Sequence, residues 1–557
     1  MAQDNSKSSE QSSSIRETVE SIWIAVVLAF VLRAFVLEAF VIPTGSMAPR
    51  LMGQHWQFDC PACGYHYAFG LPHASNAPSV NLSAPLSLGG RTGAPLCPNC
   101  SCRNTFRKEY AYGGDRVLVL KYLYRFTEPK PWEVVVFKNP QDNEQNYIKR
   151  LIGLPGQMIE IVHGNVFVRD GKDFNNDGRI DREDFANPRA EKECPWYILR
   201  KKSRKTQDVM WQVIFDNDYQ PDPVIYKART GREWRPLWRD TTGRDEWTRD
   251  HGGRIFKFAG SKDVEAPSEL RFATGTEIDR QRFCPVYAYN QPSPPGPKGY
   301  DPNVDVCSDL KLSLTFVPRQ SSGLRVGLHI SSLSDHFRAW VDTDGSCTLE
   351  HGVSDGGDVK WDEQPWDSVR LDPLVAGKAY DVALTNVERQ VTLWINGKAV
   401  LTSTENQYTS DRNRIIRAVA RAVPTPTVAI LARGGAAELW HVKLMRDVYY
   451  TCPFIGQDPD KPGRATTGNP MVLRKFNDKP DDMDEFFVLG DNSPASLDSR
   501  LWRNHAATLR PGYELGTVPR YNMIGRAFFV YWPGGFRLPM LKRLPIVPNV
   551  GRMRLIR

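Results

Sequence analysis

The sequence predicts a mainly β protein with an N-terminal transmembrane helix, a β-rich core, an inserted β-sandwich of the jelly-roll kind and a small cysteine-containing insert. Many short segments alternate apolar and polar residues, and 42 Gly and 41 Pro punctuate them, which is typical of strands joined by turns. The hydrophobic content of 41% and the aromatic content of 11% favour packed cores over disorder. With 557 residues, the chain is long enough for three or four domains.

Residues 21–42 form the predicted transmembrane anchor, which follows a polar tail at 1–20. The stretch 22–42 is apolar except for Arg33 and Glu38, and its length is about what a bilayer core requires. A cleavable signal peptide is the alternative, but the tail lacks the basic region that such peptides carry. The net charge of +8 is small for this length and includes no polybasic run, which argues against nucleic-acid binding.

A single serine stands directly behind this apolar segment. Ser46 lies in the sequence Ile-Pro-Thr-Gly-Ser-Met at 42–47, a few residues beyond the point where the chain would leave a bilayer. A nucleophile at this place reaches only substrates that are themselves held at the membrane surface.

Lys149 is the candidate base for this serine, because no His-Asp pair stands out in the sequence. It lies in a predicted strand within Tyr-Ile-Lys-Arg-Leu-Ile-Gly-Leu-Pro-Gly at 147–156. Burial among apolar side chains lowers the pKa of a lysine and yields the neutral amine that a base must have. Taken alone, a strand lysine with its amine in solvent is the alternative.

A third segment, 486–500, runs from an apolar strand into Gly-Asp-Asn and then into Ser-x-Asp-Ser-Arg. Together with the serine box, the Gly-Asp-Arg-Val-Leu-Val segment at 114–119 and the lysine box, it makes the chain resemble the type I signal peptidases. These are membrane-anchored Ser-Lys proteases that remove leader peptides from exported proteins. One departure is Ser-Pro-Ala at 493–495, where the family pattern more commonly has Arg after Gly-Asp-Asn.

The resemblance implies a role for each matching residue. Ser46 attacks the scissile carbonyl, and Lys149 takes its proton and later delivers it to the leaving amine. The Thr44 hydroxyl joins the Ser46 backbone N–H in an oxyanion hole, and Ser496 hydrogen-bonds the Lys149 amine. The residues that give structural support are Asp491, Asp498 and Arg500. No cofactor is needed for catalysis.

The resemblance also implies substrates, partners and a location. The substrates are preproteins with small-x-small leader cleavage sites, which bind as extended peptides. The partners are the lipid bilayer and the export machinery, with no nucleic acid. The location is the bacterial inner membrane, with a single pass and the catalytic domain on the extracytoplasmic side. The catalytic core comprises residues 43–54, 112–170 and 451–557.

Two Cys-x-x-Cys pairs mark an insert at 55–111, and they consist of Cys60, Cys63, Cys97 and Cys100. Paired thiolates at this spacing are typical of a zinc ribbon, in which four sulfurs surround the ion. Two disulfides are the alternative, because the insert is expected to lie outside the cytoplasm.

An acidic segment at 171–190 fits a calcium loop. Its predicted ligands are the side chains of Asp173, Asn175, Asp177 and Asp184 and the carbonyl of Arg179, with Gly178 at the sharp turn. A solvated acidic turn is the alternative.

Residues 195–450 alternate with period 2 over several segments, including 380–385 and 390–401, and Asn-Gly at 396–397 is a strong hairpin signal. The pattern and the Trp-Ile-Asn-Gly hairpin resemble the concanavalin-like or laminin-G-like sandwich. Such an insert is expected to act as a scaffold or to bind a glycan or protein ligand.

Two other functions compete with a working signal peptidase. In one, the core has lost its activity and the molecule is a membrane-anchored binding protein that uses its inserts. In the other, the chain belongs with the soluble self-cleaving repressors, which share the Ser-Lys dyad. The joint presence of Ser46, Lys149 and Ser496 argues against the first, and the predicted anchor and the serine box argue against the second.

Overall fold

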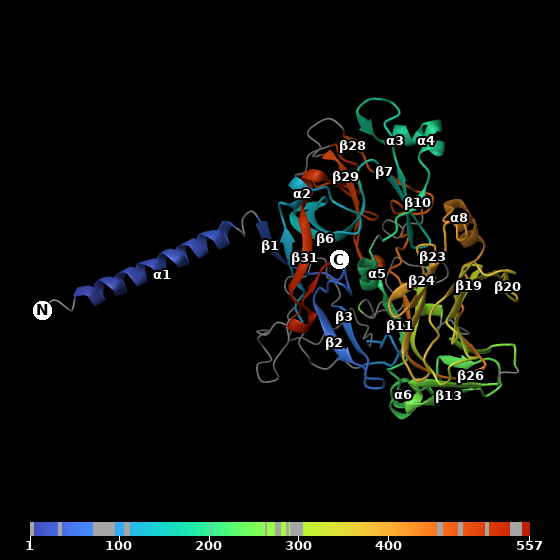
Figure 1. The fold of residues 1–557 in the computed structure, drawn as a ribbon. Coiled ribbons are helices and arrows are strands. Elements are labelled where there is room, and N and C mark those ends of the chain that lie inside the picture. The colour runs from blue at the N-terminus through green and yellow to red at the C-terminus, as the bar shows by residue number, and fades with distance from the viewer. Residues whose placement is uncertain are drawn as a thin grey trace.

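A computed structural model describes residues 5–31, 36–70, 95–104, 112–201, 203–261, 264–272, 280–285, 289, 305–453, 460–476, 483–506, 512–534 and 549–557. Strands dominate these residues, which confirms the predicted mainly β class. Figure 1 shows one long helix, α1 (Asn5–Val31), projecting from a body of β-sheets. The predicted boundaries between domains stay predictions.

The predicted anchor at 21–42 is not one continuous helix, and this part of the prediction is wrong. Helix α1 already begins at Asn5, inside the predicted polar tail, and it ends at Val31. Residues Leu37–Val41 form strand β1, which pairs antiparallel with β4 (Arg116–Leu120). In this strand the backbone groups pair with those of β4, and successive side chains point to opposite faces of the sheet. Within the described residues, we find no helix with the length and apolar character that a membrane span needs.

The core sheet contains eight strands, seven of them in the order β1-β4-β31-β5-β6-β29-β30, with β32 beside β31. The bounds not yet given are β5 (Val134–Asn139), β6 (Asp142–Gly153), β29 (Glu485–Leu489), β30 (Val518–Pro519), β31 (Met523–Trp532) and β32 (Arg554–Leu555). Strands from both ends of the chain therefore meet here. All five side chains of β29 are buried, and so are the last five of β6, which makes the centre of this sheet dry.

A four-stranded sheet, β10-β8-β7-β27, continues from the core. Its strands are β7 (Gln157–Val162), β8 (Asn165–Asp170), β10 (Tyr197–Ile198) and β27 (Met471–Val472). Two two-stranded sheets complete this part, β2 (His55–Asp59) with β3 (His66–Gly70), and β9 (Arg179–Ile180) with β28 (Lys475–Phe476). The short helices are α2 (Leu123–Phe126), α3 (Arg182–Ala186), α4 (Pro188–Glu193), α5 (Arg204–Met210), α6 (Pro223–Thr230) and α8 (Arg412–Arg421).

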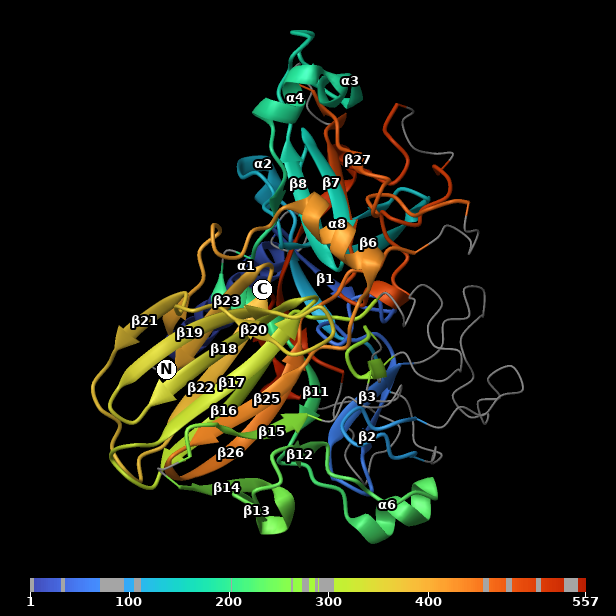
Figure 2. The ribbon, with the colours of Figure 1, turned by 90° about the vertical axis from the view of Figure 1, so that its right-hand side faces the viewer.

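Two further eight-stranded sheets lie between β11 and β26 in the sequence. One has the order β13-β14-β26-β16-β22-β23-β24 with β11 beside β26, and the other has the order β12-β15-β25-β17-β18-β19-β20 with β21 beside β19. Figure 2 shows them as layers of long strands below the core. Alternate residues of the strands point into a shared apolar centre, as Leu310, Leu312 and Leu314 do on β16.

The strands of the first of these sheets are β11 (Gln212–Asp216), β13 (Trp247–Asp250), β14 (Ile255–Gly260), β16 (Leu310–Pro318), β22 (Tyr380–Val387), β23 (Gln390–Ile395), β24 (Lys398–Thr402) and β26 (Gly435–Arg446). The strands of the second are β12 (Trp238–Asp240), β15 (Ser268–Phe272), β17 (Arg325–Ser332), β18 (Asp335–Asp342), β19 (Ser346–Val353), β20 (Lys360–Trp361), β21 (Asp367–Arg370) and β25 (Val428–Arg433). We refer to the pair as the sandwich.

Candidate active site

Ser46 lies in the turn that follows β1, and the Gly-Asp-Asn segment after β29 holds that turn in place. The backbone N–H of Asn492 donates to the Ser46 carbonyl over 3.0 Å. The Asn492 side-chain amide donates to the Gly45 carbonyl over 2.8 Å. Ser46 is only 7% exposed. Two boxes far apart in the sequence thus fix the backbone on both sides of one hydroxyl.

Lys149 reaches this hydroxyl from β6. Its Nζ lies 2.7 Å from Ser46 Oγ in a hydrogen bond, and the side chain is 4% exposed. Burial lowers the pKa of Lys149 to about 8, although the carboxylates of Asp498 and Asp491 act in the opposite direction. The sequence alternative of a lysine with its amine in solvent is therefore wrong. The pair has the geometry of an activated nucleophile and its base.

Thr44 and Ser496 were both assigned to this site from the sequence. The Thr44 hydroxyl donates to Ser46 Oγ over 3.3 Å, so it lies beside the nucleophile. The predicted hydrogen bond between Ser496 and the Lys149 amine is absent, because Ser496 Oγ is buried and has no hydrogen-bond partner. That hydroxyl lies close to Gly490, where an added Cβ would come within 2.2 Å of it. Any catalytic role of Ser496 stays a prediction.

Two buried ion pairs flank the site. Arg150, next to Lys149 on β6, donates to both carboxylate oxygens of Asp491 over 2.6 Å each. Arg500 pairs with Asp498 over 2.8 Å, and the same carboxylate accepts from the Gly490 N–H over 3.0 Å. In both pairs the carboxylate has a cation beside it, which leaves the Lys149 amine without an ion pair of its own in the described chain.

Tyr289 is a residue of this site that sequence reasoning missed. Its ring packs against Ala48, and a Cβ added to Gly45 would lie 2.1 Å from the ring. Its hydroxyl donates to the Gln54 carbonyl over 3.2 Å. The residue comes from the segment between β15 and β16, so the sandwich supplies an aromatic side chain to the serine turn. No local pattern identifies it, because the contact spans more than 200 residues of sequence.

The four cysteines of the two Cys-x-x-Cys pairs converge. Their sulfurs all lie within 4.8 Å of one another, with 3.6 Å between Cys60 and Cys100 and 3.7 Å between Cys63 and Cys97. A tetrahedral ion with Zn–S bonds of about 2.3 Å requires sulfur separations of roughly 3.8 Å. A disulfide requires about 2.05 Å. The arrangement fits a four-thiolate metal centre better than two disulfides.

In the predicted calcium loop, the carboxylates accept hydrogen bonds from the backbone of the loop itself. Asp184 accepts the N–H groups of Phe174 and Asp181 over 2.7 and 3.0 Å, and it forms a capping box at the start of α3. Asp173 accepts the N–H of Gly178 over 3.0 Å. Across the described ranges, the four cysteines are the one group of three or more Cys, His or acidic residues with converging ligand atoms. Calcium binding by Asp173, Asn175, Asp177, Arg179 and Asp184 stays a prediction.

Comparisons with known proteins point to one family. The model of the family "signal peptidase, peptidase S26" matches residues 105–214 and 385–532, which include Lys149 and Asp498 but not Ser46. Signal peptidase I of Rickettsia typhi is 26% identical over 172 residues, covering 31% of this chain and 49% of that protein. Signal peptidase I of Leptolyngbya laminosa is 34% identical over 101 residues, covering 16% and 47%.

A probable signal peptidase I-1 of a Synechocystis species is 34% identical over 82 residues, covering 14% of this chain and 41% of that protein. The chain thus spans less than half the length of these relatives. A solved carbohydrate-binding module of Bacillus subtilis aligns with 37% of this chain and 94% of its own at 10% identity, and the TM-score of 0.23 supports no conclusion. The family match and the relatives support the predicted signal peptidase function and the serine endopeptidase class.

Proposed function

We propose that this protein is a signal peptidase I, a serine endopeptidase that cleaves N-terminal leader peptides from exported preproteins with a Ser-Lys dyad. The observation that carries the proposal is the 2.7 Å contact between the buried Lys149 amine and the Ser46 hydroxyl. A binding protein with a decayed core has no need to keep a lysine amine buried at a serine hydroxyl, so this contact favours the enzyme.

The proposed reaction follows from the position of the amine. The neutral Lys149 Nζ accepts the Ser46 hydroxyl proton as Oγ attacks the scissile carbonyl, and it then gives that proton to the leaving amine. A water molecule hydrolyses the acyl-enzyme with the same amine as base. The Thr44 hydroxyl, 3.3 Å from Ser46 Oγ, supports a role with the Ser46 N–H in stabilising the oxyanion.

Substrates and location belong to the same proposal. The substrates are preproteins with small-x-small leader sites, and the partners are the bilayer and the export machinery. The proposed location is the bacterial inner membrane, with the active site on the extracytoplasmic side. Supporting this, α1 exposes large apolar side chains, among them Trp23, Ile24 and Phe30, each at least 65% exposed. An exposed apolar surface of this kind favours burial in lipid or against another protein.

Direct cleavage tests the proposed activity. Purified protein in lipid is incubated with a leader-bearing preprotein, and the product termini are read by mass spectrometry. We expect one cut after the small-x-small site, at the boundary between leader and mature chain. A substrate with a bulky residue directly before the cut is the control and is expected to remain intact. Failure to cut the preprotein, or cutting of both substrates alike, contradicts the proposal.

The pH dependence of cleavage is a second expected result. Only the neutral amine is a base, and the pKa of Lys149 is lowered to about 8. Cleavage must therefore rise with pH, by about tenfold between pH 7 and pH 9, and then level off. Initial rates at low substrate concentration from pH 6 to pH 10 measure this. A rate that is flat or that falls over this range is incompatible with a neutral Lys149 base.

We further propose that the four-cysteine cluster holds a structural zinc ion. Its place in the fold supports a structural role, because Asn99, between Cys97 and Cys100, accepts the Asp216 N–H over 2.7 Å and donates to the Tyr219 carbonyl over 2.9 Å. The cluster thus ties the insert to β11 of the sandwich. When bound, zinc supplies stability here and no chemistry.

Metal analysis of variants tests the zinc proposal. We expect about one zinc ion per chain, loss of it in Cys63→Ser and retention of it in Cys102→Ser. Cys102 is the matched control, because it is buried beside the cluster but is not one of the four converging residues. A metal-free protein that shows four fewer reactive thiols when denatured without reductant would instead establish the two disulfides.

A further inference from the structure

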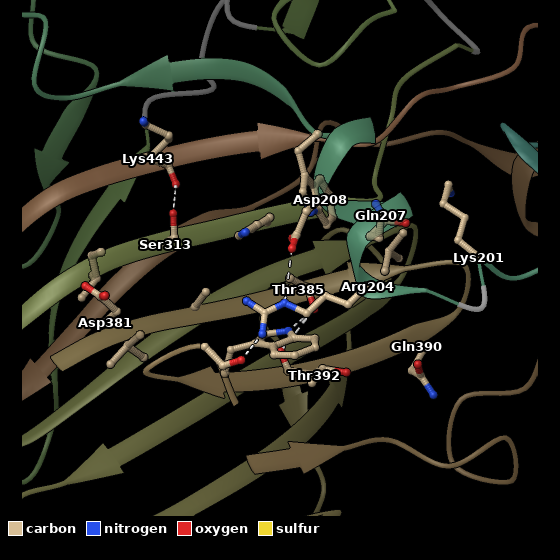
Figure 3. Close-up of a pocket in the computed structure, with 18 of the residues that line it drawn as sticks. Lys201, Arg204, Gln207, Asp208, Ser313, Asp381, Thr385, Gln390, Thr392 and Lys443 are labelled. Atoms are coloured by element: carbon tan, nitrogen blue, oxygen red, sulfur yellow. Dashed lines mark hydrogen bonds and ion pairs between the residues drawn. The ribbon is translucent and has the colours of Figure 1, made fainter. Parts of the chain in front are cut away.

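A cavity with a volume of about 670 Å³ lies on the sandwich. Its floor is the outer face of strands β16, β22, β23 and β26, and helix α5 with its flanking residues forms one wall. In Figure 3 the α5 side chains Arg204, Gln207 and Asp208 lie over the strand that carries Thr385. We call this cavity the sandwich cleft. Its volume falls within the range of ligand sites in proteins.

We propose that the sandwich cleft binds an oligosaccharide that carries carboxylate groups. This inference is independent of the proposed peptidase activity, because the residues that define the Ser46 site do not line the cleft.

Small and hydroxyl-bearing side chains make the cleft floor. Strand register places Lys311, Thr385 and Thr392 in one cross-strand row, and Lys443, Ser313, Ala383 and Trp394 in the next. Ser313, Thr385 and Thr392 line the cleft. The Ser313 hydroxyl donates to the Lys443 carbonyl over 3.5 Å and the Thr385 hydroxyl to the Thr392 carbonyl over 3.4 Å, so both keep a lone pair with which to accept a hydrogen bond. Short side chains in the middle of both rows leave the space of the cleft open. Such a surface offers hydrogen-bond acceptors to the hydroxyl donors of a sugar.

One cation of the cleft is uncompensated. Lys443 pairs with Asp216 over 2.7 Å, Arg204 with Asp208 over 3.3 Å and Lys201 with Asp447 over 2.8 Å. Lys311 has no carboxylate partner in the described chain, and its ammonium faces the Trp211 ring at 5.9 Å. Burial lowers the pKa of Lys311, and the Asp208 carboxylate, which is paired with Arg204, opposes this only in part.

An anionic ligand supplies the missing counter-ion. The nearby carboxylates have other partners: Asp208 is bound to Arg204 and acts on Lys311 only from beyond ion-pair distance, and Asp381 accepts the Thr315 hydroxyl over 2.8 Å. A carboxylate placed over the middle of the floor would meet Lys311 directly while its neighbouring hydroxyls meet the Thr385 and Thr392 side chains. Charge-assisted hydrogen bonds of this kind are the strong ones in polar recognition.

An acidic peptide fits the sandwich cleft less well than an acidic sugar. Strands β16 and β22 each have a paired strand on both sides, so their backbone groups are used within the sheet. A peptide therefore cannot add to this face as an extra strand, which is how extended chains usually dock on sheets. Recognition here has to come from side chains, and those present are hydroxyls, amides and cations.

Binding measurements on the full chain test the proposal. The probes for calorimetry are tetragalacturonate, the neutral maltotetraose and the peptide tetraglutamate. We expect tetragalacturonate to bind at least tenfold more tightly than the other two. If tetraglutamate bound equally well, the site would recognise any polyanion and the proposal would be overturned. Absence of tetragalacturonate binding would also overturn it.

Matched variants locate the binding. Lys311→Met is expected to weaken tetragalacturonate binding at least tenfold, because it removes one charge-assisted contact. Lys360→Met is the control, since this exposed lysine lies on β20 of the opposite sheet and carries the same charge change. Both variants are expected to cleave leader peptides at the parent rate, which keeps the result separate from the peptidase proposal. Unchanged binding in Lys311→Met places the ligand elsewhere and contradicts the inference.

Discussion

Replacing Lys149 by methionine is expected to abolish leader cleavage while making the protein more stable at pH 7. Without a base at 2.7 Å, the Ser46 hydroxyl keeps its proton, and the rate is expected to fall at least a thousandfold, about the contribution of a positioned base and its nucleophile. Ser46→Ala is expected to lose activity to the same extent, because the two groups act as a unit.

The gain in stability follows from the sign of the pKa change. The pKa of Lys149 is about 8 in the folded state against 10.5 as the ordinary value, so the unfolded chain holds this proton more tightly. Below pH 8 this difference lowers the free energy of unfolding by about 3 kcal/mol, and the deficit disappears as pH rises towards 10.5. Methionine fills a similar volume without a charge.

Denaturation at pH 7 and pH 10 measures this effect. The free energy of unfolding of Lys149→Met is expected to exceed that of the parent at pH 7 and to match it more closely at pH 10. Lys138→Met is the control, because this exposed lysine lies on the neighbouring strand β5 and is expected to change neither stability nor activity. Cleavage near the parent rate in Lys149→Met would end the proposed mechanism.

Replacing Asp491 by alanine is expected to destabilise the protein by about 3–5 kcal/mol. Asp491 is fully buried and Arg150 is 1% exposed, so removal of the carboxylate leaves a guanidinium cation uncompensated in a dry place. The Trp132 carbonyl, which accepts from Arg150 over 2.6 Å, offers too little compensation. Urea denaturation compares the variant with the parent.

A double variant and a surface control sharpen this prediction. Asp491→Leu with Arg150→Met removes both charges and is expected to be more stable than Asp491→Ala. Glu193→Ala removes an exposed carboxylate that pairs with Lys172 over 3.2 Å and with Arg189 over 3.0 Å, and it is expected to leave stability nearly unchanged. If Asp491→Ala lowered the free energy of unfolding no more than Glu193→Ala does, the buried Arg150–Asp491 pair would not be needed for stability.

Short sequence boxes, together with the family resemblance that they carry, were sufficient to find the reacting groups. Ser46 and Lys149 stand in short boxes with distinctive neighbours, and the structure brings them into contact. The two Cys-x-x-Cys pairs were identifiable for the same reason, since each spacing delivers two sulfurs from one turn. Period-2 alternation at 380–385 corresponds to strand β22, and that at 390–401 to the hairpin of β23 and β24.

Local sequence patterns do not predict contacts between residues that lie far apart in the sequence. Tyr289 reaches the serine turn from the sandwich, and the Arg150–Asp491 pair spans more than 300 residues. The anchor prediction at 21–42 failed at its end because a short, mostly apolar segment suits a strand as well as a helix, and Leu37–Val41 pairs with β4. Ser496 shows that a matching motif does not determine the hydrogen-bond partner of its hydroxyl.

The rate at which an active ester acylates Ser46, followed from pH 6 to pH 10, tests most directly whether a neutral Lys149 amine activates this serine. Mass spectrometry locates the acyl group on the peptide that contains Ser46. The expected rate rises about tenfold from pH 7 to pH 9, levels off near pH 9, and vanishes at every pH in Lys149→Met. Acylation that proceeds equally fast in Lys149→Met, or that shows no ionisation near pH 8, would contradict the account.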